Sequence, residues 1–178
     1  MLFFSRSLRC AGAGFLSCIL AVSISACTGG RTALFEDEAK PEWKEAEVLL
    51  PSWPTDGNLI PLYVSSGTSA QFFVDGRSLT LGNDGVVRFT VVIRAGGGAE
   101  NVSYEGIRCE TAERKLYAIG RGRGEWVSPR NSAWQRISDN TLNRHHAVLF
   151  KEFFCLPGSA LPTRDEILRS LRGAASLR

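Results

Sequence analysis

The chain has 178 residues, of which 44% are hydrophobic and 22% charged, and its formal net charge is +3 at neutral pH. Two of the 21 basic residues, Arg6 and Arg9, lie in an N-terminal segment that we expect to be cleaved, which leaves 19 basic and 18 acidic residues. A net charge of +1 gives no reason to expect a nucleic-acid partner. The remaining 152 residues (178 less 26) are the size of one ordinary domain with a real core.

The first 26 residues have the layout of a lipoprotein signal peptide. Arg6 and Arg9 form a basic start without an acidic residue, and no charged residue follows from residue 11 to 26. This apolar run is too short for a membrane-spanning helix, which needs ~20 apolar residues. It ends at the small residue Ala26, as signal cleavage requires. An ordinary secreted protein with an incidental Cys27 is the alternative.

The quartet Ile24-Ser25-Ala26-Cys27 resembles the bacterial lipobox, an aliphatic residue and two small residues before a cysteine. The resemblance implies that the Cys27 thiol carries diacylglycerol, that the chain is cut before Cys27, and that the new amino group is acylated. More than one chain is needed because a single acyl chain anchors only marginally. Thr28 follows in place of the Asp that resembles an inner-membrane retention signal. We therefore expect a lipid anchor in the outer membrane, with the domain facing the periplasm or the cell surface.

Residues 27–45 are mostly small and charged, which predicts a flexible tether before a single domain over residues 46–178. The domain begins with VLLPSWPTDGNLIPLYV, which contains three prolines. Proline removes a backbone donor and interrupts both helices and central strands. We expect an extended segment that lies across the domain and ends in an edge strand over residues 59–64.

Strand patterns follow from residue 70. Asp75-Gly76 and Asp84-Gly85 are both hairpin signals. Alternation in VVRFTVVIR (86–94) places Val87, Phe89 and Val91 on one face of a strand. The segment NVSYEGIRC (101–109) changes phase, so a bulge near Gly106 is expected to restore a single core face. KLYAIGR (115–121) predicts a further strand.

The last third of the domain has helical spacing. Leu142, His146, Leu149 and Phe153 share one helix face. Leu156-Pro157-Gly158 interrupts this helix. Thr163 and Glu166 form a capping box that opens a second helix, with Ile167, Leu168 and Leu171 inward.

The number of cysteines predicts one disulfide in this domain. Cys10 and Cys18 leave with the signal and Cys27 carries lipid, so Cys109 and Cys155 remain. Two thiols in an oxidising compartment predict one disulfide, which joins a strand to a helix. Strands first and helices last indicate an α+β domain, an antiparallel sheet with the C-terminal helices packed on one face.

The stretch FFVDGRSLTLGNDGVVRFTVVIRAGGGAENVSYEGIRCETAERKLYAIGRG, followed by FKEFFC, is similar to the cryptic-neisserial-protein-like family of proteobacterial envelope proteins. The resemblance spans about residues 45–157, and NVSYEGIRC with the later FFC is its most specific part. The family is one of unknown function, so the resemblance implies no catalytic residues in this chain.

Several side chains are candidates for chemistry. His145 and His146 are neighbours, and neighbours on a helix point ~100° apart, so we expect solvated or partly packed histidines and no metal site. Glu105 and Glu110 have opposite parity in a strand, and Glu105 is expected to pair with Arg108 or to lie in solvent. We expect no catalytic residues and no cofactor.

The loop GRGRGE resembles a phosphate-binding glycine loop only superficially, because it lacks the Lys-Ser/Thr end and the following helix. It is expected to be a hairpin tip, and Arg121, Arg123 and Trp126 are the candidate binding surface there. The sequence favours a non-enzymatic, lipid-anchored module that binds a protein or glycan of the envelope. The alternative is an enzyme, or an enzyme accessory, acting on cell-wall or lipopolysaccharide components.

Overall fold

The structure is a computed structural model that describes residues 42–122, 124–140, 144–156 and 160–177. The predicted signal peptide, Cys27 and residues 28–41 of the predicted tether lie outside the described residues. A compact unit begins at Glu42 and includes every described residue. No helix within the described ranges is long and apolar enough to cross a membrane.

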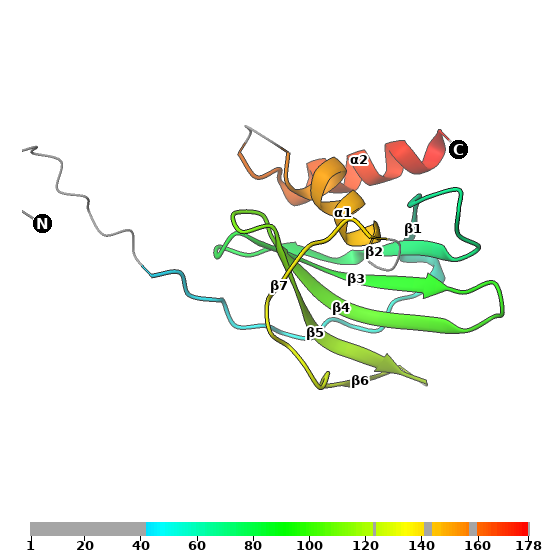
Figure 1. The fold of residues 1–178 in the computed structure, drawn as a ribbon, viewed down its shortest axis with the longest axis horizontal. Helices are drawn as coiled ribbons and strands as arrows, with labels where there is room; N and C mark the ends of the chain where they lie inside the picture. Colours follow the sequence, from blue (N-terminus) through cyan, green and yellow to red (C-terminus); the bar gives the residue numbers. More distant parts are fainter. Residues whose placement is uncertain (1–41, 123, 141–143, 157–159, 178) are drawn as a thin grey trace, which may run out of the picture. The chain divides into compact units, whose positions relative to one another are not determined.

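The sheet is antiparallel, as predicted, with the strand order β1-β2-β3-β4-β5-β6, and β7 pairs with β5 as well (Figure 1). Its strands are β1 (Leu59–Leu62), β2 (Gln71–Leu81), β3 (Val86–Arg94), β4 (Glu100–Arg108), β5 (Glu113–Arg121), β6 (Glu125–Val127) and β7 (Gln135–Arg136). A short 3₁₀ turn, η1 (Asp56–Asn58), precedes β1. The helical elements are α1 (Arg144–Val148), the π-helical turn η2 (Leu149–Phe154) and α2 (Arg164–Ser176). These elements define an α+β domain with C-terminal helices.

One of the two predicted hairpin turns is a bulge in the structure. Asp84-Gly85 does lie in the turn between β2 and β3, where Gly85 has a φ of 75°. Asp75-Gly76 lies inside β2, because the register between β2 and β3 shifts between Asp75 and Thr80. Ser78 fills the irregularity, since its hydroxyl donates to the Asp75 carbonyl at 3.0 Å and accepts from the Thr90 amide at 2.9 Å. The predicted turn at Asp75-Gly76 is therefore wrong.

Strand β3 is buried on both faces. All residues from 86 to 92 are buried, including Arg88 and Thr90 on the face opposite Val87, Phe89 and Val91. Strand β4 pairs with β3 without a register shift from Glu100 to Arg108, so the predicted bulge near Gly106 does not lie between these strands. The pairing of β4 with β5 does shift between Tyr104 and Glu105, because Tyr117 is an extra residue on β5. The change of phase in β4 instead reflects two covered faces, each with its own apolar side chains.

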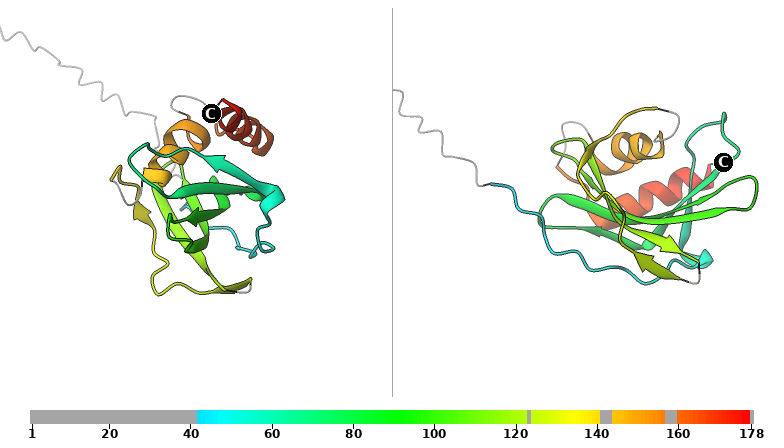
Figure 2. Two further views of the ribbon diagram at one scale, coloured as in Figure 1. Left: turned by 90° about the vertical axis from the view of Figure 1, so that its right-hand side faces the viewer. Right: turned by 60° about the horizontal axis from the view of Figure 1, so that its bottom comes forward.

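The extended segment over residues 42–55 covers one of these faces (cyan in Figure 2). The indole of Trp126 donates to the Pro51 carbonyl at 2.9 Å, and the Trp53 and Trp126 rings lie 5.2 Å apart. Gly120 permits this contact, because a Cβ there would lie 2.6 Å from the Trp53 ring. The prediction of an extended segment lying across the domain is confirmed.

The other face of β3 joins the main core. Val87, Phe89 and Val91 belong to one cluster of buried side chains with members from β1, β2, β4, η2 and α2. From the helical elements the cluster contains Leu149, Phe153, Phe154, Ile167, Leu168 and Leu171. The predicted capping box opens α2: Thr163 accepts from the Glu166 amide, and the Glu166 carboxylate accepts from the Thr163 amide at 2.7 Å.

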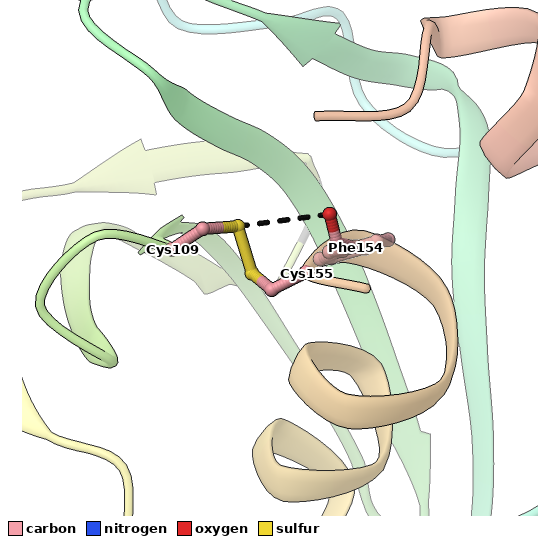
Figure 3. The surroundings of a disulfide bond; sticks show 3 residues. All are labelled: Cys109, Phe154 and Cys155. Atoms are coloured by element: carbon pink, nitrogen blue, oxygen red, sulfur yellow. Dashed lines mark hydrogen bonds between the residues drawn. A yellow bond between two sulfur atoms is a disulfide. The ribbon is translucent and has the colours of Figure 1, made fainter. Parts of the chain in front are cut away.

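Cys109 and Cys155 form the predicted disulfide, which joins the end of β4 to the end of η2 across a Cα–Cα distance of 5.4 Å. The sulfur of Cys109 also lies 3.6 Å from the carbonyl oxygen of Phe154 (Figure 3). A bonded sulfur has no proton to donate, so this approach is a packing contact. The bridge closes a loop with a sequence separation of 46 residues.

We expect Cys109→Ser or Cys155→Ser to lower the free energy of unfolding by roughly 2–5 kcal/mol, because the unfolded chain gains the freedom of the opened loop. Denaturant titration of the full chain measures this loss, and Phe154→Leu, which keeps the bridge, is the packing control. Thiol labelling of denatured, unreduced wild-type protein should find neither cysteine free. Stoichiometric labelling of both would contradict the bridge.

Candidate functional site

Arg121, Arg123 and Trp126 are the residues that the sequence predicts as a binding surface, and the structure gives Arg121 and Trp126 different surroundings. Arg121 is exposed at the end of β5, and Arg123 lies outside the described residues. Trp126 is half-buried, with its ring 5.2 Å from Trp53 and 6.4 Å from Tyr104. Its indole N–H is already used by the Pro51 carbonyl. Trp126 thus holds the extended segment against the sheet.

A network of charged and aromatic side chains fastens the start of this segment. The Glu45 carboxylate accepts from the Lys115 ammonium at 2.6 Å and from the Tyr117 hydroxyl at 2.8 Å. Burial acts to raise the pKa of Glu45, but the hydrogen bonds from Lys115 and Tyr117 outweigh it and lower that pKa. Burial and the Glu45 carboxylate both raise the pKa of Tyr117. The segment therefore docks through a carboxylate that stays ionised.

Asp84 is the second fastening point. Its carboxylate accepts from the Arg88 guanidinium at 2.5 and 3.1 Å and from the Ala46 amide at 2.8 Å, while its carbonyl accepts from the Trp43 indole at 2.8 Å. Burial acts to raise the pKa of Asp84, but these hydrogen bonds and the charge of Arg88 lower it to about 2. Asp84 thus compensates a buried arginine and binds the segment at once.

An apolar cavity of about 510 Å³ opens at the other end of β2. Its lining comes from β1, the connection to β2, the start of β2, η2 and the end of α2. The apolar lining residues are Pro61, Leu62, Val64, Ala70, Phe72, Phe73, Phe153, Ala174 and Ala175. Ser65, Ser66, Thr68 and Gln71 add hydrogen-bonding groups, and Glu152 adds one carboxylate. The sequence analysis missed this cavity, because its lining comes from parts of the chain far apart in sequence.

A polar cluster lies inside the core. Glu105 faces the same side of the sheet as Phe89, its partner across β3 and β4, and its Oε2 lies 2.5 Å from Nε2 of His146 on α1. Ser103 donates to the other carboxylate oxygen at 2.6 Å. His145 stacks on Phe72, and the centroids of the two imidazole rings are 3.8 Å apart.

This geometry corrects the sequence interpretation. Glu105, His145 and His146 are only 3–5% exposed, so neither histidine is solvated and Glu105 pairs with His146 in place of Arg108. Burial acts to raise the pKa of Glu105, but the hydrogen bond and charge of His146 outweigh it and lower that pKa. Burial and the charge of His146 lower the pKa of His145 to about 4.

Glu105 and Glu110 are not brought together as an acid and a base. The Glu110 carboxylate accepts from Arg108 at 2.8 Å, and Glu105 lies in the core. Glu105 lies two residues before the apolar Ile107 and so shares its face of β4, which was the available signal for a buried carboxylate. The helical spacing of His146 with Leu149 and Phe153 was the available signal for its buried partner on α1.

The antiparallel sheet, the C-terminal helices and the Cys109–Cys155 bridge define a disulfide-bonded α+β domain. The chain belongs to the CNP1-like family, whose profile matches residues 38–172. It is 28% identical over 157 residues to Cryptic neisserial protein 1 of Neisseria gonorrhoeae (strain ATCC 700825 / FA 1090), covering 75% of this chain and 74% of that protein. No solved structure matches the chain. The resemblance inferred from NVSYEGIRC and FFC is confirmed.

The lowered pKa of Asp84 predicts how the stability of the protein depends on pH. Its pKa is lowered to about 2 in the folded protein, so its stabilisation is complete above the ordinary carboxyl range and is lost as the pH falls toward 2. Asp84→Asn should lower the free energy of unfolding at pH 7 by ~2 kcal/mol or more, since Arg88 loses its partner. The variant's stability should also fall less steeply than wild type between about pH 4 and pH 2.

Denaturant midpoints measured across this pH range test both statements. Asp56→Asn is the control, because Asp56 also pairs with an arginine, Arg94, but its side chain is 85% exposed. A parallel pH dependence for wild type and Asp84→Asn would contradict the prediction.

Proposed function

We propose that this protein is a lipid-anchored protein of the bacterial outer membrane whose domain binds a protein partner of the envelope and does no catalysis. The lipobox-like quartet ending at Cys27 supports the anchor. The bonded state of Cys109 and Cys155 supports an oxidising compartment such as the periplasm or the cell surface. In this proposal the C-terminal helices cover one face of the sheet, and α2 and η2 form a wall of the binding cavity.

The apolar cavity carries the proposal. Its volume of about 510 Å³ lies in the range of ligand sites. The lining includes Phe72, Phe73, Phe153 and Leu62, residue types that suit the apolar side chains of a protein segment. Sugars need many directed hydrogen bonds, and the polar groups here come mainly from one connection, residues 65–71. A protein partner therefore fits the cavity better than a glycan.

The same lining favours binding over hydrolysis. Cleavage of a cell-wall glycan ordinarily uses two carboxyl groups that face one bond. Glu152 is the carboxylate among the residues that line this cavity. An enzyme acting on cell-wall or lipopolysaccharide components would need a second acid or base supplied from elsewhere.

Site-specific photo-cross-linking in intact envelopes tests the binding proposal. A photoreactive residue at Ser66, exposed on the cavity rim, should give a discrete cross-link to one protein, and the same probe at Gln135 on β7 should not. Gln71→Trp, which fills the rim, should reduce the Ser66 cross-link at least several-fold, whereas Gln135→Trp should leave it unchanged. Equal cross-linking from both probe positions, or a cross-link insensitive to Gln71→Trp, would overturn the proposal.

The anchor has its own test. Cys27→Ala should abolish lipoprotein-type processing and move the protein out of the detergent phase, because no acyl chain is attached. Cys18→Ala, within the signal, is the matched control and should leave partitioning unchanged. Recovery of Cys27→Ala in the detergent phase at the wild-type level would contradict the lipid anchor.

A further inference from the structure

The buried cluster of Glu105, His145 and His146 brings together the groups that bind transition metals. Each residue offers one donor atom, and the three donors lie within 4.8 Å of one another. Two come from α1 and one from β4, and the disulfide joins the end of β4 to the end of η2, which follows α1 directly. None of its members lines the apolar cavity, but His145 stacks on Phe72, which does line it.

An ion pair between Glu105 and His146 does not account for the whole cluster. His145 is 5% exposed, and its Nδ1 finds no hydrogen-bond partner in the described part of the chain. Nδ1 of His146 is likewise buried without a partner among the described residues. Buried polar atoms are ordinarily paired, and an unpaired one costs free energy. A ligand shared by the two adjacent imidazoles better explains a core in which Nδ1 of His145 has no hydrogen-bond partner among the described residues.

We propose that Glu105, His145 and His146 bind one zinc-like divalent transition metal ion. Two imidazole nitrogens and a carboxylate oxygen are a donor set that suits zinc, and three protein ligands leave one position for water or another group. Cys109 and Cys155 are bonded to each other and supply no thiolate. The ion replaces the direct contact between Glu105 and His146 and gives the unpaired His145 ring a partner.

The geometry needs only small movements of side chains. Donor atoms around one tetrahedral zinc ion lie ~3.3 Å apart, given metal–ligand distances of about 2.0–2.2 Å. The contact between Oε2 of Glu105 and Nε2 of His146 is 2.5 Å and widens, whereas the widest pair, within 4.8 Å, closes. Ser103 already holds the other oxygen of Glu105 at 2.6 Å, which leaves Oε2 for the ion. Such support of a ligand is typical of metal sites.

The sequence makes the test unusually direct, because His145 and His146 are the two histidines of the entire chain. The full chain, without a histidine tag and in detergent micelles, is stripped with a chelator and loaded with Zn²⁺ or Co²⁺ during refolding with the disulfide intact. One Zn²⁺ per chain should remain after gel filtration. The Co²⁺ form should show visible ligand-field bands, and the ¹⁵N resonances of both labelled imidazoles should move.

Variants separate ligands from bystanders. His145→Gln and Glu105→Gln should weaken Zn²⁺ binding by more than ~100-fold in competition with a chromophoric chelator, and Ser103→Ala by roughly 10–100-fold. Glu100→Gln, a solvent-accessible carboxylate on the same strand, should bind like wild type. Zinc uptake unchanged in His145→Gln would overturn the proposal. Refolded wild type that retains no Zn²⁺ would overturn it as well, whatever the variants do.

Discussion

The burial of β3 on both faces is the constraint on which the rest of this domain depends. Seven consecutive residues of this strand, 86–92, are buried, so each face of the strand needs a layer of protein that covers it. An antiparallel sheet commonly leaves one face to solvent, but here side chains of η2 and α2 share a buried cluster with Val87, Phe89 and Val91, and residues 42–55 also contact the sheet. A polar group near β3 must therefore find a partner inside the protein. Arg88 finds Asp84, and the Thr90 amide finds Ser78.

The same constraint explains how the helices are held. Glu105 precedes Cys109 by four residues on β4, and His146 precedes Cys155 by nine on α1 and η2. The two elements are thus tied twice, by a polar contact at one end and by a covalent bond at the other. A helical segment of eleven residues would be marginal alone. The two ties, together with Leu149, Phe153 and Phe154 in the core, fix its position on the sheet.

Features that depend on a few residues could be predicted from the sequence. The covering of one part of the chain by a segment far away in sequence could not. Counting cysteines predicted the bridge, and Thr163 with Glu166 predicted the start of α2, because each depends on few residues. The burial of Arg88 and Thr90 could not be predicted in this way, since the extended segment begins some 40 residues earlier at Trp43. The prediction of solvated or partly packed histidines was also wrong, because it assumed ideal helical geometry. Ideal helical geometry turns His145 away from His146, whereas the structure places both rings in the core, 3.8 Å apart.

The placement of the extended segment bears on how an anchored domain can use its cavity. Residues 43–46 attach at Asp84, beyond the carboxyl end of β2, whereas Gln71, Phe72 and Phe73 line the cavity at the amino end of the same strand. Eleven residues of strand separate these ends by ~30 Å at about 3.3 Å per residue. The chain then runs along the sheet through Trp53 and reaches β1 from the side opposite the main core. The described part of the segment therefore leaves the cavity uncovered, because its contacts are made with β4, β5, β6 and the turn at Asp84.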